Sequence, residues 1–190
     1  KKALVECDGD MDKAIDFLRE RYPDMPLVGM EPAVKPACLH TRSGVVGVLA
    51  TERSLDGELF RRTAARYGRG IEVVTAPGTG FVELVESDRE ATPEAEACVR
   101  RAMAGMLERG ADQIVLGCTH YPFLMPVLER IVAGRDVTII DPSPAVARRT
   151  AQLLDQYGLR AAPDHRPTYE FRTFADEAYR ERLRAKAFAE

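Results

Sequence analysis

The stretch GADQIVLGCTHYPF, from Gly110 to Phe123, contains the strongest fold signal in this 190-residue sequence. Its three consecutive apolar residues, Ile114 to Leu116, are followed at once by a glycine, which is typical of a short strand buried on both faces. Pro122 suits the first turn of a helix, because its φ is already helical and it lacks an N–H that would be unpaired there. The stretch therefore predicts a strand, a loop and a helix, the repeating unit of a parallel α/β sheet.

Similar units lie on both sides of this stretch. Short apolar runs alternate with helical patterns through the middle of the chain, which indicates an α/β fold doubly wound around a parallel sheet. Helix starts are marked by Ser54, before a helix that runs to about Tyr67, and by the Thr-Pro and Ser-Pro pairs that begin at Thr92 and Ser143. The predicted strands are Val45–Ala50, Ile71–Thr75, Gln113–Leu116 and Val137–Ile140.

Two breaks divide the chain. The segment VGMEPAVKP, 28–36, contains two prolines and predicts an extended connector between domains. A second break falls at 141–144, and a charged last helix is predicted from Phe174 to about Phe188. We therefore predict a helical part at 1–30, an α/β domain at 31–142, and a helix with a tail at 143–190.

Composition excludes several classes of function. The net charge of −3, with acidic and basic residues interspersed, argues against a polyanion-binding surface and predicts no nucleic-acid partner. No run approaches the ~18 apolar residues that cross a bilayer, so we expect a cytoplasmic protein with no membrane partner. The four cysteines match neither a CxxC pair nor a zinc framework, so no metal site is predicted.

Cys118 stands where an open parallel sheet binds its ligands, just beyond the carboxyl end of a strand. The next helix would direct its positive end at Cys118 and Thr119, an arrangement that holds a carboxylate and favours a thiolate. His120 can donate a hydrogen bond or act as an acid. The residues alone leave an alternative open, since a single cysteine after a strand is usually core packing and a nearby histidine is usually a satisfied loop residue.

The string LGCTHYPF, preceded by GADQIV, resembles the second catalytic motif of glutamate racemases, in the aspartate/glutamate racemase family. The segment at 28–37 is similar to the family's connector between two α/β domains, and GVVGVLATERSL, 44–55, to a strand and loop of its substrate site. The segment at 137–154 resembles the strand and helix that return to the first domain. The likeness implies a racemase-like fold with only a partial first domain, of which residues 1–30 would be the remnant.

This resemblance implies cofactor-independent interconversion of L- and D-glutamate, which supplies D-glutamate for peptidoglycan synthesis, cell-wall biogenesis and cell shape. One thiolate removes the α-proton and a second thiol protonates the opposite face. On this pattern Cys118 is one catalytic thiol, with Thr119 and His120 at the substrate, and Thr51 and Ser54 supply hydroxyls. A strand-end threonine and a helix-capping serine are the equally good structural alternatives. Glutamate is the implied small-molecule partner, and family members commonly form homodimers.

Cys7 stands in register for the first catalytic cysteine of the family. Its neighbours Glu6 and Asp8 disfavour a thiolate and repel glutamate, and the Asn and Thr of the family's first motif are missing. The first 20 residues also resemble the helical module of elongation factor Ts. Three hypotheses therefore stay open. The chain is an N-terminally truncated glutamate racemase, or a non-catalytic racemase-fold remnant or binding protein in which Cys7 is a buried helix residue, or it carries a translation-factor-binding module at residues 1–21.

Overall fold

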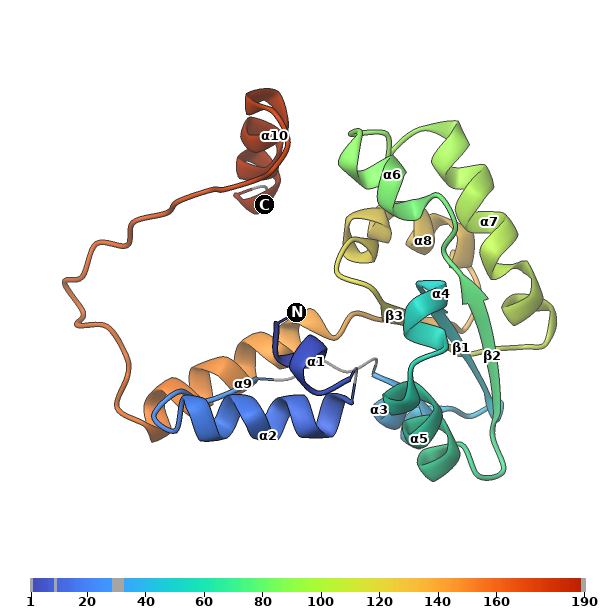
Figure 1. Ribbon diagram of the computed structural model, residues 1–190. Coiled ribbons are helices and arrows are strands. Elements are labelled where there is room, and N and C mark those ends of the chain that lie inside the picture. Colours follow the sequence, from blue (N-terminus) through green and yellow to red (C-terminus); the bar gives the residue numbers. More distant parts are fainter. Residues whose placement is uncertain (1, 9, 29–32, 189–190) are drawn as a thin grey trace. The chain divides into compact units, whose positions relative to one another are not determined.

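The structure is a computed structural model that describes residues 2–8, 10–28 and 33–188. The chain forms two compact units, Lys1–Leu153 and Leu154–Glu190. Its elements, labelled in Figure 1, are α1 (Lys2–Glu6), α2 (Met11–Arg21), α3 (Val34–His40), β1 (Val45–Ala50), α4 (Glu52–Leu55), α5 (Glu58–Tyr67), β2 (Glu72–Pro77), α6 (Phe81–Glu86), α7 (Pro93–Glu108), β3 (Gln113–Gly117), the 3₁₀ helix η1 (Tyr121–Leu124), α8 (Met125–Val132), β4 (Thr138–Ile140), α9 (Ser143–Gln156) and α10 (Glu177–Ala187). Among the described residues, no helix has the length and apolar character needed to span a membrane.

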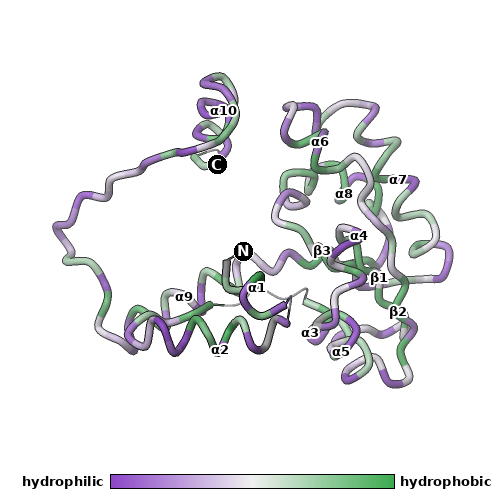
Figure 2. Tube along the Cα trace, in the orientation of Figure 1, coloured by the Kyte–Doolittle hydropathy of each residue, from purple (hydrophilic) through white to green (hydrophobic). Residues whose placement is uncertain are grey.

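A four-stranded parallel sheet with the order β2-β1-β3-β4 organises the first unit. Figure 2 shows β1 and β3, the two central strands, in hydrophobic colours, as expected for strands covered on both faces. Ala50 at the end of β1 pairs with Pro77 of β2 and with Gly117 of β3. The carboxyl ends of these three strands therefore lie together at one edge. The four predicted strands are confirmed, with ends that differ by at most two residues.

Helices cover both faces of the sheet, which confirms the doubly wound α/β prediction (Figure 1). On one face, α6, α7 and α8 pack around a large cluster that includes Met103, Met106 and Leu128. On the other face, α3 and α5 bury a smaller cluster that includes Val34 and Phe60. Burial of these side chains is the main source of stability for the unit.

The prediction of one helix capped by Ser54 was wrong. Thr51 caps the short helix α4, where its hydroxyl accepts a hydrogen bond from the backbone N–H of Ser54 at 3.2 Å. Gly57 then takes an extended conformation (φ −64°, ψ 138°), and α5 starts after it. A side chain there would lie 3.1 Å from the carbonyl oxygen of Ser54, so the glycine permits the tight break between the two helices.

The predicted connector at 28–36 is only partly extended, because α3 begins at Val34. Pro36 fits there because the N–H groups of the first helical turn have no intrahelical partner. Residues 29–32 of the connector lie outside the described part of the chain. The last helix is shorter than predicted and begins after Asp176, whose carboxylate accepts from the N–H of Tyr179 at 2.8 Å. The domain boundaries at 30 and 142 stay a prediction.

The N-terminal helix pair forms as the sequence predicts. Asp10 caps α2 by accepting from the N–H of Lys13 at 3.1 Å, and Ala3 and Ala14 are buried. Gly9, which stands between the two helices in the sequence, lies outside the described residues. The likeness of this helix pair to the elongation factor Ts module stays a prediction.

Asp112, directly before β3, stabilises the edge of the sheet at which the strands begin. Its carboxylate accepts hydrogen bonds from the hydroxyl of Thr41 at 2.6 Å and from the backbone N–H groups of Arg42 and Ser43 at 2.6 and 2.9 Å. Burial by itself would raise the pKa of Asp112, but these hydrogen bonds, together with the Ser43 side chain, lower it to about 2. The ionised carboxylate thus ties the loop before β1 to β3.

Candidate functional site

The candidate site lies at the edge where the strands end. Cys118 follows β3 directly, and because Ala50 pairs with Gly117, Cys118 stands beside Thr51 at the end of β1. A Cβ at Gly117 would lie 2.7 Å from the Cβ of Ala50, so a glycine is needed for the two strand ends to approach. This is the edge at which parallel sheets bind their ligands.

Three side chains, those of Cys118, His120 and Glu86, are linked by hydrogen bonds. The Cys118 Sγ lies 3.8 Å from Nδ1 of His120, and Nε2 of His120 lies 3.2 Å from a carboxylate oxygen of Glu86, at the end of α6. The His120 side chain is about one-third exposed and Cys118 is half-buried, so these linked side chains are accessible from solvent. An imidazolium donates from both ring nitrogens, so His120 can bond Glu86 and a thiolate at once.

Tyr121 anchors the loop that carries Cys118 and His120. Its ring is fully buried and meets Phe81 edge to face at 5.0 Å, and its hydroxyl donates to the carbonyl of Gly78 at 3.4 Å. Burial, reinforced by the neighbouring charge of Cys118, raises the pKa of Tyr121, so the phenol stays a neutral donor. A Cβ at Gly78 would lie 2.5 Å from Tyr121 Cζ, so only glycine allows this contact.

Thr51 and Ser54 form a hydroxyl pair at the end of β1, the strand that pairs with β3. Their oxygens are 2.8 Å apart, and Thr51 Oγ1 also accepts from the N–H of Ser54. Each hydroxyl has one proton, and the bond between them uses only one of the two. The second proton remains for a ligand, so the structural role of Thr51 as a cap is compatible with the predicted substrate contact.

The segment after Cys118 differs from the prediction in one respect. Its first turn is the 3₁₀ helix η1, and the α-helix α8 begins only at Met125. The backbone N–H of Tyr121 donates to the carbonyl of Cys118 at 3.2 Å, so this N–H is already used. The helical segment begins close to Pro122, as predicted, but with a 3₁₀ turn; the role of its N-terminus at Cys118 and Thr119 stays a prediction, and Thr119 is exposed in the intervening loop.

Cys7, the second predicted thiol, lies in the turn after α1, and not after a strand. It is half-buried, and its N–H donates to the carbonyl of Ala3 at 3.0 Å. Among the described residues, no hydrogen bond joins Cys7 to Cys118, so its catalytic role stays a prediction. Glu86 was missed by the sequence reasoning, since it is 34 positions from His120 and belongs to no local motif.

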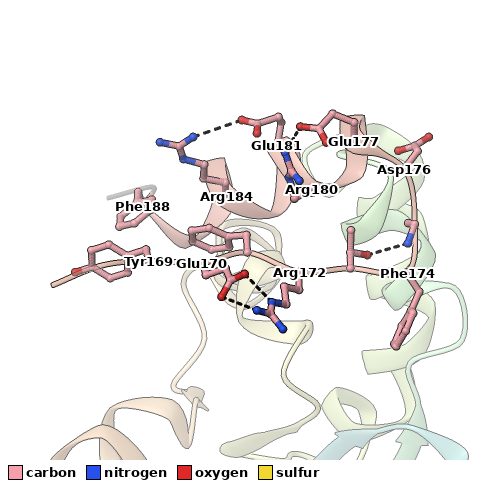
Figure 3. Close-up of a pocket in the computed structure, with 13 residues that line it drawn as sticks. Tyr169, Glu170, Arg172, Phe174, Asp176, Glu177, Arg180, Glu181, Arg184 and Phe188 are labelled. Atoms are coloured by element: carbon pink, nitrogen blue, oxygen red, sulfur yellow. Dashed lines mark hydrogen bonds and ion pairs between the residues drawn. The ribbon is translucent and has the colours of Figure 1, made fainter.

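The second unit contains a separate pocket of about 940 Å³, formed by 169–188 (Figure 3). The ring of Phe188 packs edge to face against Tyr169 and Phe171, at 5.0 and 5.8 Å. The arginines of this tail pocket pair with carboxylates, as Arg172 does with Glu170 at 2.7 Å. Throughout the described part of the chain, no group of three or more His, Cys, Asp or Glu side chains is arranged to hold a metal ion.

Comparisons with known proteins consistently identify racemases as relatives of this chain. The family model described as Asp/Glu/Hydantoin racemase matches residues 3–150. A glutamate racemase of Roseiflexus sp. (strain RS-1) is 46% identical over 84% of this chain and 58% of its own length, and that of Pseudomonas syringae pv. tomato is 44% identical over 88% and 61%. The chain thus spans about three fifths of these relatives. The Escherichia coli glutamate racemase, solved with L-glutamate and the activator UDP-MurNAc-ala, superimposes with a TM-score of 0.70 at 30% identity, over 90% of this chain and 64% of that one.

Proposed function

The chain belongs to the Asp/Glu/hydantoin racemase family, and on this premise we propose that it interconverts L- and D-glutamate. The observation that carries the proposal is the pair of hydrogen bonds that link Cys118 to His120 and His120 to Glu86 at the ligand-binding edge of the sheet. The similarity to glutamate racemases and the L-glutamate held by the Escherichia coli relative support glutamate as the substrate.

In the proposed reaction, the Cys118 thiolate removes the α-proton from one enantiomer. The C–H electron pair stays on the α-carbon and its carboxylate, and a second acid then delivers a proton to the opposite face. Cys7 is the residue in register for this second acid. In the reverse direction Cys118, as a thiol, donates the proton, so one group serves both enantiomers in opposite protonation states.

His120 and Glu86 act in support of the thiol. A protonated His120 donates to the Cys118 thiolate at 3.8 Å, and Glu86 fixes the ring through the other nitrogen. The same imidazolium can turn toward the substrate carboxylate, where the negative charge of the carbanion accumulates. Glu86 is therefore a positioning residue, and His120 is the residue that contacts substrate or thiol.

The hydroxyl pair of Thr51 and Ser54 completes the proposed site. The hydroxyl proton that their mutual bond leaves over can donate to an anionic group of glutamate. Thr119, exposed in the same loop as Cys118, supplies a further hydroxyl. Fixed donors of this kind stabilise charge that develops in the transition state without reorganisation.

The wider context of the proposal follows from the family. D-glutamate made by the enzyme would enter peptidoglycan and so support the cell wall and cell shape. We further propose that the reaction needs no cofactor, that it takes place in the cytoplasm, and that the protein works as a homodimer. Sedimentation at several protein concentrations tests the last point.

Exchange of the α-proton with solvent deuterium tests the activity directly. Incubation in D₂O should give deuterated L- and D-glutamate, detected by NMR and chiral chromatography, and Cys118→Ser should abolish racemisation together with exchange from the enantiomer whose α-proton Cys118 removes. Cys98→Ser is the matched control, because Cys98 is also half-buried but lies in α7, where its thiol donates to the carbonyl of Thr79. Racemisation that survives Cys118→Ser would contradict the site assignment.

A non-catalytic racemase-fold binding protein is the second candidate. The observation in its favour is that Cys7 follows a helix and is flanked by Glu6 and Asp8. Calorimetry with L- and D-glutamate separates the two cases, since binding without deuterium exchange is the signature of the second. Exchange of only one enantiomer without inversion would instead indicate a half-site at Cys118 that lacks its second acid.

A further inference from the structure

The backbone of Gly78 links three elements that surround the Cys118 site. Gly78 follows β2 directly, and its N–H donates to the carbonyl of Ala50, at the end of β1, at 3.1 Å. Its own carbonyl accepts from the N–H of Phe81 at 3.1 Å and from the hydroxyl of Tyr121 at 3.4 Å. Phe81 begins α6, and Tyr121 begins the segment that follows the thiol loop. One buried glycine thus joins β1, α6 and η1.

Tyr121 connects this glycine to the residue that carries the thiol. The backbone N–H of Tyr121 donates to the carbonyl of Cys118 at 3.2 Å. Its ring and the ring of Phe81 are both fully buried, with their centroids 5.0 Å apart. A close-packed ring cannot shift unless its neighbours shift with it. The position of Cys118 therefore follows the position of the first turn of α6.

The short helix α6 carries the same constraint on to Glu86. It has only six residues, from Phe81 to Glu86, and three of them, Phe81, Leu84 and Val85, are buried in the core. With half of its side chains held in this way, the helix moves as one piece, so a shift at Phe81 displaces Glu86. The contact between Glu86 and Nε2 of His120, at 3.2 Å, is already at the long end of the range for a hydrogen bond. A small displacement of α6 is therefore enough to break it.

We propose that Tyr121 is a positioning residue that keeps Glu86 within hydrogen-bonding distance of His120. Its hydroxyl acts through the Gly78 carbonyl and α6, so its effect on the Cys118 thiol passes through His120. Burial and the neighbouring charge of Cys118 raise the pKa of the phenol, so it stays a neutral donor while the thiol changes protonation. The consequence for turnover rests on the proposed racemase function, whereas the contacts themselves do not.

A double-mutant cycle between Tyr121 and Glu86 tests the proposal. Tyr121→Phe removes the hydroxyl and keeps the ring, and we expect kcat for racemisation to fall roughly tenfold with KM changed less than about twofold. In a Glu86→Gln background the same substitution should change kcat less than about twofold, because the contact through which Tyr121 acts is already lost. The matched control, Tyr67→Phe, removes a phenol hydroxyl from the cluster on the other face of the sheet and should change neither constant more than about twofold.

Alkylation of Cys118 by iodoacetamide gives a second measurement that needs no turnover. The thiolate is the reactive form, so the rate at Cys118, followed by mass spectrometry at neutral pH, reports how well His120 supports the thiolate. The rate should fall roughly threefold or more in Tyr121→Phe and in Glu86→Gln, and no further in the double variant. This pattern in a chain without deuterium exchange would remove the proposed function and leave the positioning role in place.

Circular dichroism and thermal unfolding check that each variant folds. If Tyr121→Phe does not fold, Phe81→Leu takes its place, since it removes the edge-to-face contact and keeps the hydroxyl, with the same expectation in the Glu86→Gln background. Two results would overturn the proposal. One is equal kcat and alkylation rates in Tyr121→Phe and Tyr67→Phe, and the other is losses that multiply in the double variant, as a purely structural role would give.

Discussion

Replacing Asp112 by asparagine should destabilise the fold at neutral pH far more than a conservative change usually does. The Asp112 carboxylate is buried and accepts three hydrogen bonds from Thr41, Arg42 and Ser43. An amide has only one oxygen, so its NH₂ group would face a backbone N–H or the hydroxyl and leave a buried donor unpaired. The substitution therefore removes both the charge and the geometry of the contact.

The pKa of Asp112 sets the expected magnitude. It is lowered from an ordinary 3.8 to about 2 in the folded protein. At ~1.4 kcal/mol per unit, the ionised form favours the folded state by about 2 kcal/mol. Because the folded pKa is the lower one, this contribution is complete above pH 3.8 and is lost as the pH falls toward 2. Roughly 1 kcal/mol of it has gone at pH 3.

Urea unfolding of wild type and Asp112→Asn, followed by circular dichroism from about pH 7 to about pH 3, measures this contribution. The variant should be less stable by about 2 kcal/mol at neutral pH, and the gap should narrow by roughly 1 kcal/mol at the acid end. Asp136→Asn is the control, because Asp136 lies near the same edge but is exposed in its pair with Arg42 at 2.6 Å, and it should cost less than about 1 kcal/mol. A gap that stays constant with pH, or equal losses in the two variants, would refute the reasoning.

Two further predictions concern the site and the core. Glu86→Gln should lower the racemisation rate on the order of 10²-fold with little change in KM, because His120 loses the carboxylate that holds its ring. Glu83→Gln, at an exposed position of the same helix, should leave the rate unchanged, and equal rates for the two variants would contradict the positioning role of Glu86. Gly47→Ala should destabilise by about 1–3 kcal/mol, since its Cβ would lie 2.6 Å from the sulfur of Met106, whereas Gly105→Ala meets nothing within 4 Å in α7 and should stabilise by up to about 1 kcal/mol. Thermal or urea unfolding that gives both glycine variants the same sign would contradict this account.

The sheet and its strand ends were predictable from local sequence. A strand buried on both faces needs a continuous apolar run, and that requirement leaves a local mark at Val45–Ala50 and Gln113–Gly117. Helix boundaries were less predictable where a single glycine decides them. Gly57 interrupts the helix predicted from Ser54, because whether a residue continues or ends a helix depends on its neighbours in space.

The candidate site likewise has a part that the sequence predicts and a part that only the fold creates. Cys118, Thr119 and His120 are consecutive and follow a strand, so the sequence by itself determined their place at the ligand edge. The partnership of His120 with Glu86 arises only when α6 packs beside η1, and Lys35, Arg66 and Arg149 come to line one groove only when α3, α5 and α9 converge. Hydrophobic periodicity is a property of neighbouring residues, whereas a hydrogen bond across 34 positions or a cluster of charges depends on distances that only the folded chain defines.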